Sequence, residues 1–145
     1  KVGKVTFTEA YKAVNEYRQK CPQKAVTFYA QNYPAMGWAV FMAGGSCPVI
    51  PCTDKAFLKD AAAMEVEETN TDEYKKMVKS DIGSIIYSKS GTEIPVQLSS
   101  GKYILKYIHP GSGKMIVIDK SLKINGVYKL KVPDKKEGIY WFHKL

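Results

Sequence analysis

The feature that most constrains this chain is a change in the spacing of its apolar residues near residue 80. Before that point apolar side chains recur at three- and four-residue steps, which is typical of helices; after it they alternate with polar ones, which is typical of strands. We therefore expect an α/β part at residues 1–66, a polar connection at 67–81 and an antiparallel β-domain at 82–145.

The front part alternates helical and strand-like segments, which is the order found in a parallel α/β layer. Thr6 with Glu9 three residues later predicts a capping box, and Asp54 predicts another helix start. Two strands cannot complete a parallel sheet, and a wholly apolar helix has too little partner surface in a chain this short, so this part looks incomplete. The expected elements are helices over 6–20, 36–43 and 55–64 and strands over 24–30 and 47–51.

The back part contains short strand-like runs separated by turn residues. Asn125-Gly126 is a type I′ hairpin signal, and residues 99–101 and 109–113 supply further glycine turns. A strand about every ten residues is typical of a sandwich or barrel. The expected fold class is thus α+β, with a partial α/β layer followed by a small antiparallel β-sandwich. Its expected strands cover 82–89, 93–99, 102–109, 114–120, 127–133 and 138–145.

The net charge of +8 raises the question of nucleic acid binding. The basic residues are 21 lysines and a single arginine, Arg18, so the planar guanidinium that reads guanine and clamps phosphate is nearly absent. Lysines that alternate along strands form a solvated face. Nucleic acid binding stays the weakest of the functional alternatives.

The cysteines and the hydropathy pattern give little sign of a metal site or a membrane span. The three cysteines lack the spacing of a tetrahedral zinc site. A bridge between Cys47 and Cys52 is sterically conceivable, and buried free thiols are the alternative.

No run of 18 apolar residues exists to span a bilayer. The start at Lys1 suggests a processed or truncated chain, and no cofactor is expected.

Catalytic groups are sparse in this sequence. The segment HPGSGK, residues 109–114, lacks the residues of a phosphate loop and predicts a hairpin turn. The only histidines, His109 and His143, lie at a turn and a strand end, which does not favour a Ser/His/Asp triad. The acids at 65–73 lie in a polar connection, where no strand end would hold a carboxylate pair. We expect no catalytic residues.

Aromatic side chains are the more informative set. Their flat faces can stack on sugar rings, or they can pack across strands in a core. In the final strand Tyr140 and Phe142 must face opposite to Trp141 and His143, so one of these pairs lies on the outer face or under a neighbouring domain. The aromatic residues in question are Trp38, Tyr103, Tyr107, Tyr140, Trp141 and Phe142.

Several stretches resemble the C-terminal region of bacterial (β/α)₈-barrel glycoside hydrolases. Residues 36–46, MGWAVFMAGGS, and 56–64, AFLKDAAAM, are similar to the last helix and closing segment of such barrels. Residues 83–114 are similar to the small β-sandwich, labelled collagen-binding, that follows the barrel, and 139–145 fits its closing strand.

This resemblance implies where a site would lie. A catalytic carboxylate is expected at the end of the seventh barrel strand. If residues 24–32 are that strand, the position is near Gln31 and Asn32, whose amides cannot act as nucleophile or acid. The residues expected to contact sugar are Gln31, Asn32, Tyr33, Trp38 and Trp141.

The leading hypothesis is a non-catalytic accessory region of a secreted or periplasmic carbohydrate-active enzyme. Its partners would be a polysaccharide or the barrel of the parent enzyme, which the sandwich would brace. The alternatives are a freestanding protein-interaction module and, more weakly, a basic nucleic-acid-binding domain. Fold analogy does not transfer function, so the collagen label carries little weight.

Overall fold

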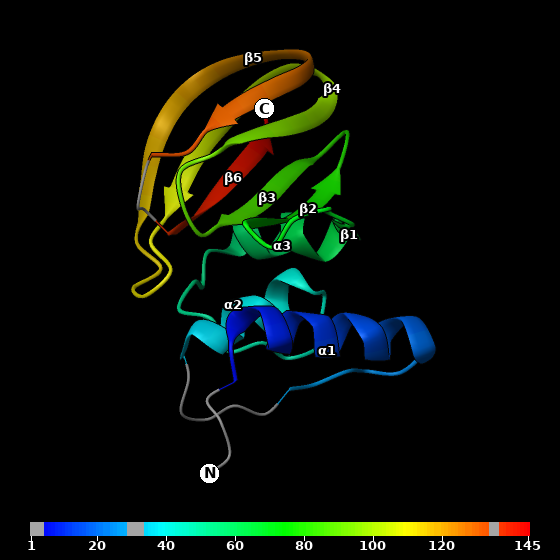
Figure 1. The fold of residues 1–145 in the computed structure, drawn as a ribbon. Coiled ribbons are helices and arrows are strands. Elements are labelled where there is room, and N and C mark those ends of the chain that lie inside the picture. Colours follow the sequence, from blue (N-terminus) through cyan, green and yellow to red (C-terminus); the bar gives the residue numbers. More distant parts are fainter. Residues whose placement is uncertain (1–4, 29–33, 134–136) are drawn as a thin grey trace. The chain divides into compact units, whose positions relative to one another are not determined.

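Figure 1 shows the computed structural model of the chain, which describes residues 5–28, 34–133 and 137–145. The chain divides into two compact units, Lys1–Pro51 and Cys52–Leu145. We call them the front unit and the β unit. In the described residues no helix is long and apolar enough to cross a membrane.

The front unit begins with helix α1, Phe7–Lys20. The capping box is confirmed, because Thr6 Oγ1 accepts a hydrogen bond from Glu9 N and Glu9 Oε2 accepts one from Thr6 N. The hydrogen bond from the Thr6 backbone is the main cause that lowers the pKa of Glu9. One face of the helix is buried, and its members are Phe7, Ala10, Tyr11 and Val14.

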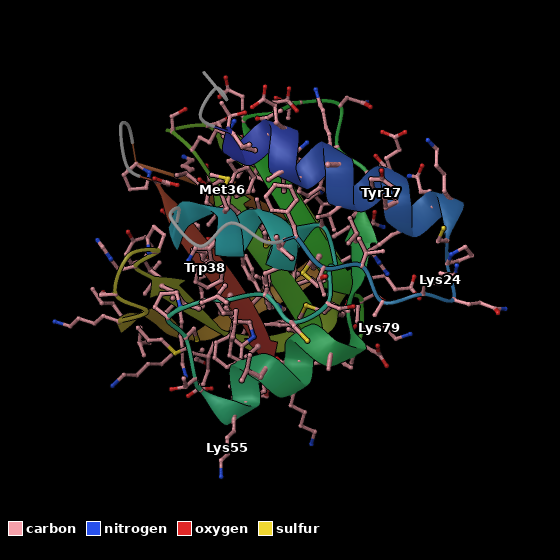
Figure 2. All side chains as sticks on the ribbon, turned by 90° about the horizontal axis from the view of Figure 1, so that it is seen from below. Tyr17, Lys24, Met36, Trp38, Lys55 and Lys79 are labelled. Carbon is pink, nitrogen blue, oxygen red and sulfur yellow. The ribbon has the colours of Figure 1, made fainter. Side chains whose placement is uncertain are left out.

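Helix α2, Pro34–Met42, is apolar on every side, as predicted, and packs against α1. Between Met36 and Met42 every residue except Gly37 is at most 7% exposed. Figure 2 labels Met36 and Trp38 on this helix.

The two strands predicted in the front unit are not found in its described residues. Residues 24–28 and 47–51 are irregular, and residues 29 and 30 lie outside the described part. Val26 O accepts a hydrogen bond from Ser46 N, but no ladder continues from it. Cys47 has a φ of 52°, which is incompatible with extended backbone. A parallel barrel layer is thus not seen in the described part of this unit.

The β unit contains helix α3, Lys55–Ala63, and an antiparallel sheet of six strands in the order β1-β2-β3-β6-β4-β5. Asp54 caps α3, as predicted, since its Oδ1 accepts a hydrogen bond from Phe57 N. The α+β class is confirmed. The strands are β1 Glu65–Glu67, β2 Tyr74–Lys79, β3 Gly83–Ser88, β4 Glu93–Ile108, β5 Met115–Lys131 and β6 Gly138–Lys144.

The segment expected to be a connection, 67–81, contains the last residue of β1 and all of β2. β1 pairs with β2, and β2 pairs with β3. Lysine and glutamate suit an edge strand, where they discourage pairing with other chains, and Lys76 Nζ lies 2.5 Å from Glu67 Oε2. These charged residues obscured the alternation of apolar and polar side chains by which a strand is predicted. The compact units divide after residue 51.

The four strands predicted between 93 and 133 are two long ones. β4 and β5 form a single hairpin whose turn lies at 109–114, as predicted; His109 N donates to Lys114 O there. The sites at 99–101 and Asn125-Gly126, predicted as turns, are bends within the strands, where the register shifts. Gly126 adopts a φ of 90°, and Ser100 Oγ donates to Asn125 Oδ1 across the bend.

The bends let the β4–β5 hairpin curve strongly, so that the sheet closes on a core of its own (Figure 1). Cross-strand alternation puts Tyr140 and Phe142 on this core face. Trp141 and His143 lie on the opposite face, as predicted, where α3 contributes Phe57 at 5.4 Å, edge to face, to Trp141. The core comprises Ile86, Ile94, Val96, Leu98, Tyr103, Leu105, Tyr107, Ile124, Leu130, Val132, Tyr140 and Phe142.

Candidate binding cleft

An open cleft of about 470 Å³ lies on the β4–β5 hairpin of the β unit. The hairpin curvature places both halves of β5 along it, with β4 and β6 at its base. The lining is mostly aliphatic and aromatic. Its residues are Leu105, Tyr107, Ile116, Ile118, Tyr128, Lys129, Leu130, Lys131, Pro133 and Tyr140.

Two tyrosines form the base of the cleft. The rings of Tyr107 and Tyr140 lie 5.5 Å apart in an edge-on arrangement, and the side chains belong to neighbouring strands. Tyr107 OH donates a hydrogen bond to Glu137 O at 3.1 Å. Burial raises the pKa of Tyr107, and it raises the pKa of Tyr140 to about 12. Both hydroxyls are therefore neutral at physiological pH.

The rim of the cleft is unusually apolar for a sheet edge. Ile116 and Ile118 are each 52% exposed, and Val117 between them is 43% exposed. β5 is one of the two edge strands of the sheet, and among the described strands it pairs with β4 alone. Natural edge strands are mostly protected by charge, proline or bulges. Three exposed aliphatic residues in a row make this edge a candidate contact surface.

A second polar cluster joins α3 to the sheet. Asp60 Oδ2 accepts a hydrogen bond from Trp141 Nε1 at 2.9 Å and lies 2.7 Å from His143 Nδ1. Asp60 is 7% exposed, and Lys106 Nζ lies 4.9 Å from the centre of the Trp141 ring. No hydroxyl or thiol nucleophile is hydrogen-bonded to this His143 in the described residues. The cluster is thus a structural link and not a hydrolytic triad.

The residues predicted to contact sugar are either outside the described part of the chain or buried. Gln31, Asn32 and Tyr33 lie outside the described residues. Trp38 is 1% exposed and packs edge to face on Phe41, and Trp141 is fully buried. Neither indole face is open to a ligand in this structure.

The other aromatics considered for sugar stacking belong to the core. Each of them is at most 5% exposed, which agrees with the alternative that these aromatics pack across strands in a core; they are Tyr103, Tyr107, Tyr140 and Phe142. Sequence reasoning missed the cleft residues Ile116 and Ile118. The signal that could have found them is the unbroken apolar run from Met115 to Ile118, which lies between Lys114 and Asp119.

The ionisable residues and cysteines form no other site in the described structure. Within residues 5–28, 34–133 and 137–145 no three His, Cys, Asp or Glu side chains are grouped to hold a metal. Cys21, Cys47 and Cys52 are free, so the bridge between Cys47 and Cys52 is not formed. Burial raises the pKa of the Cys52 thiol.

Comparison with known proteins yields few matches. A family model described as a domain of unknown function, DUF6298, matches residues 1–64. No curated protein matches the chain. A solved structure titled "Glycoside hydrolase" is similar over 55% of this chain, at 16% identity and a TM-score of 0.42. A structure of CapF with the inhibitor 3-isopropenyl-tropolone is similar over 94%, at 10% identity and a TM-score of 0.18.

The extent of these matches limits what they describe. This chain spans 19% of the glycoside hydrolase chain and 44% of the CapF chain. The family match covers less than half of the chain and ends directly before β1 begins at Glu65. The sheet that carries the cleft is therefore outside the matched family segment.

Proposed function

We propose that this chain is a non-catalytic accessory region of a carbohydrate-active enzyme, and that its β unit binds rather than reacts. The resemblance of residues 36–46, 56–64, 83–114 and 139–145 to the C-terminal region of barrel glycoside hydrolases supports the class of parent enzyme. The β unit would brace the catalytic barrel of that enzyme or hold its polysaccharide. Such an enzyme would be secreted or periplasmic.

The cleft is the single observation that carries this proposal. None of its ten lining residues is a carboxylate, histidine, serine or cysteine, so the lining has no carboxyl pair for glycoside cleavage. Glycoside cleavage needs two carboxyl groups about 5 to 10 Å apart across the scissile bond. A concave apolar surface with tyrosines at its base is suited to binding.

The test uses the 145-residue chain and the full-length gene product. We expect the chain to release no reducing sugar from a panel of plant and host polysaccharides. We expect it to bind either a glycan on an array or the catalytic domain of its parent in a pull-down. Release of reducing sugar by the chain would overturn the non-catalytic assignment. A full-length product without a carbohydrate-active catalytic domain would overturn the accessory role.

A freestanding protein-interaction module is the second candidate. The exposed apolar rim of Ile116, Val117 and Ile118 favours it, because protein partners cover such patches. Binding to an unrelated protein, without binding to any glycan or to the parent catalytic domain, would select this candidate.

A further inference from the structure

The rim and the cleft adjoin on the hairpin, because Ile116 and Ile118 belong to both, and we treat them as one surface. It consists of the exposed residues Ile116 and Ile118, the lining of the cleft and the lysines around both. We call it the hairpin surface. All of it belongs to the β unit, and most of it lies on the edge strand β5.

The geometry of β5 argues against the addition of a long partner strand to its edge. The register between β4 and β5 shifts at Leu98/Gly101, Tyr103/Leu105 and Leu105/Lys106, so the hairpin is bent along its length. Bulges interrupt a hydrogen-bond ladder and turn the edge away. A ligand would therefore bind mainly through side chains that enter the cleft.

The charge on the hairpin surface is strongly one-sided. From Lys102 to Lys131 the sequence has seven lysines and one acid, Asp119. The nearby acids are already engaged: Asp119 Oδ1 accepts from Ser121 N, Glu93 Oε1 pairs with Lys129 at 3.2 Å, and Glu137 accepts a hydrogen bond from Tyr87 OH.

Four lysines of the hairpin have no charged partner within the described part of the chain. Lys114, Lys120, Lys123 and Lys131 form no ion pair with a residue that the structure describes. Lys114 and Lys120 each lie two residues beyond the apolar rim, which is about 7 Å along a strand. A partner that carries carboxylates on both sides of an apolar group would match this pattern.

Two other occupants fit less well. A second copy of the chain would bring the same lysines against one another, and like charges placed opposite are destabilising. A sugar ring could use the polar groups of Tyr128, Lys129 and Lys131, but it would bury its other hydroxyls against aliphatic side chains that offer no hydrogen-bond partner, namely Leu105, Ile116, Ile118 and Leu130. An apolar side chain has no such cost.

We propose that the hairpin surface binds an acidic polypeptide segment that inserts an apolar side chain into the cleft. The apolar group is buried between the two halves of β5, and the flanking carboxylates meet the lysines of the hairpin. This inference does not depend on the identity of the parent enzyme, because it rests on the lining and the charge of the surface alone.

The test selects binders from a library of random linear peptides with the whole chain as bait. We expect the recovered peptides to be net acidic with an apolar centre. The variant Ile116→Ser/Ile118→Ser is expected to weaken their binding by about tenfold for each isoleucine side chain removed. Val127→Ser is the matched control, because Val127 is 59% exposed on the same strand but does not line the cleft.

A second pair of variants tests the charge. Lys114→Glu/Lys120→Glu should weaken binding and reduce its sensitivity to salt. Lys55→Glu/Lys59→Glu makes the same change in net charge on α3, where both lysines are exposed, and Lys55 extends away from the helix (Figure 2). This control should retain binding. Far-UV circular dichroism confirms that every variant is folded.

Several results would overturn the inference. These are a selection without enrichment, enriched peptides that are neutral or basic, and undiminished binding to Ile116→Ser/Ile118→Ser. Equal weakening by the two lysine variants would assign the charge effect to net charge instead of the hairpin surface. If the chain binds polygalacturonate, and the isoleucine and Lys114/Lys120 variants do not, an acidic polysaccharide would replace the peptide as the ligand.

Discussion

Replacing Asp60 with alanine tests how the helix α3 is held on the sheet. In the native chain Asp60 Oδ2 is the acceptor for Trp141 Nε1, and it also lies within hydrogen-bond distance of His143 Nδ1. Trp141 is fully buried, so in the variant its N–H would have neither this acceptor nor access to water. An unsatisfied buried donor costs about 1–3 kcal/mol.

The expected magnitude combines three effects. The cost at Trp141 is the largest, and the cost at His143 is smaller, since that side chain is 33% exposed and can bind water. Alanine is a better helix former than aspartate and returns about 0.5 kcal/mol. We expect Asp60→Ala to lower the free energy of unfolding by about 2–3 kcal/mol, and the melting temperature by on the order of 10–20 °C.

A double-mutant cycle isolates the hydrogen bond. Trp141→Phe removes the indole N–H, so Asp60→Ala should cost about 1–2 kcal/mol less in that background. Urea titration followed by circular dichroism measures each variant, and Lys59→Ala on the exposed side of α3 is the control. A destabilisation below about 0.5 kcal/mol for Asp60→Ala, or an equal one in both backgrounds, would refute the reasoning.

Single residues elsewhere in the chain give three more tests. Gly37→Ala should lower the free energy of unfolding in a urea titration although alanine favours helices, because its Cβ would lie 1.7 Å from Val49 O. Burial raises the pKa of Tyr140 to about 12, so the unfolded chain releases this proton at lower pH than the folded chain does. The free energy of unfolding should therefore fall between about pH 10 and pH 12. Melting temperatures measured across this range should fall less in Tyr140→Phe than in the native chain. In a thiol-labelling time course Cys47, which is exposed, should react in the folded chain, whereas Cys52, which is buried, should react only on unfolding.

The elements that the sequence predicted well are those decided by local chemistry. The capping box at Thr6 and Glu9 starts α1, and Asp54 starts α3, because each side chain bonds backbone groups within three residues. The alternation in β6 also predicted its two faces correctly. These signals need no knowledge of distant residues.

The signals that misled are those whose meaning depends on a partner strand. Asn125-Gly126 favours a tight turn wherever the flanking segments can pair with each other. Here Val127 pairs with Gln97 and Ile124 pairs with Gly101, so the strand continues through this site. The positive φ of Gly126, which would suit a tight turn, therefore bends a continuous strand. The strand β2 was not predicted for a related reason. A strand near the edge of a sheet needs only one buried face, so its other residues can be polar.

The candidate site could not be predicted because the relevant property is exposure. Ile116 and Ile118 have the composition of a core strand, and only the sheet order shows that β5 is an edge. Trp141 is the opposite case: its type suggests a sugar platform, yet α3 covers it. Composition specifies which residues can bind a ligand, whereas topology determines which of them face outward.

The cleft and its apolar rim have one physical origin. A straight β4–β5 hairpin would present Ile116 and Leu130 far apart along one strand and would enclose nothing. The bends at 99–101 and at Gly126 fold the hairpin over, so both halves of β5 line the same cleft. The glycine that looked like the end of a strand is therefore what creates the binding surface. The proposed binding of an acidic segment with an apolar side chain therefore depends on the curvature of one hairpin.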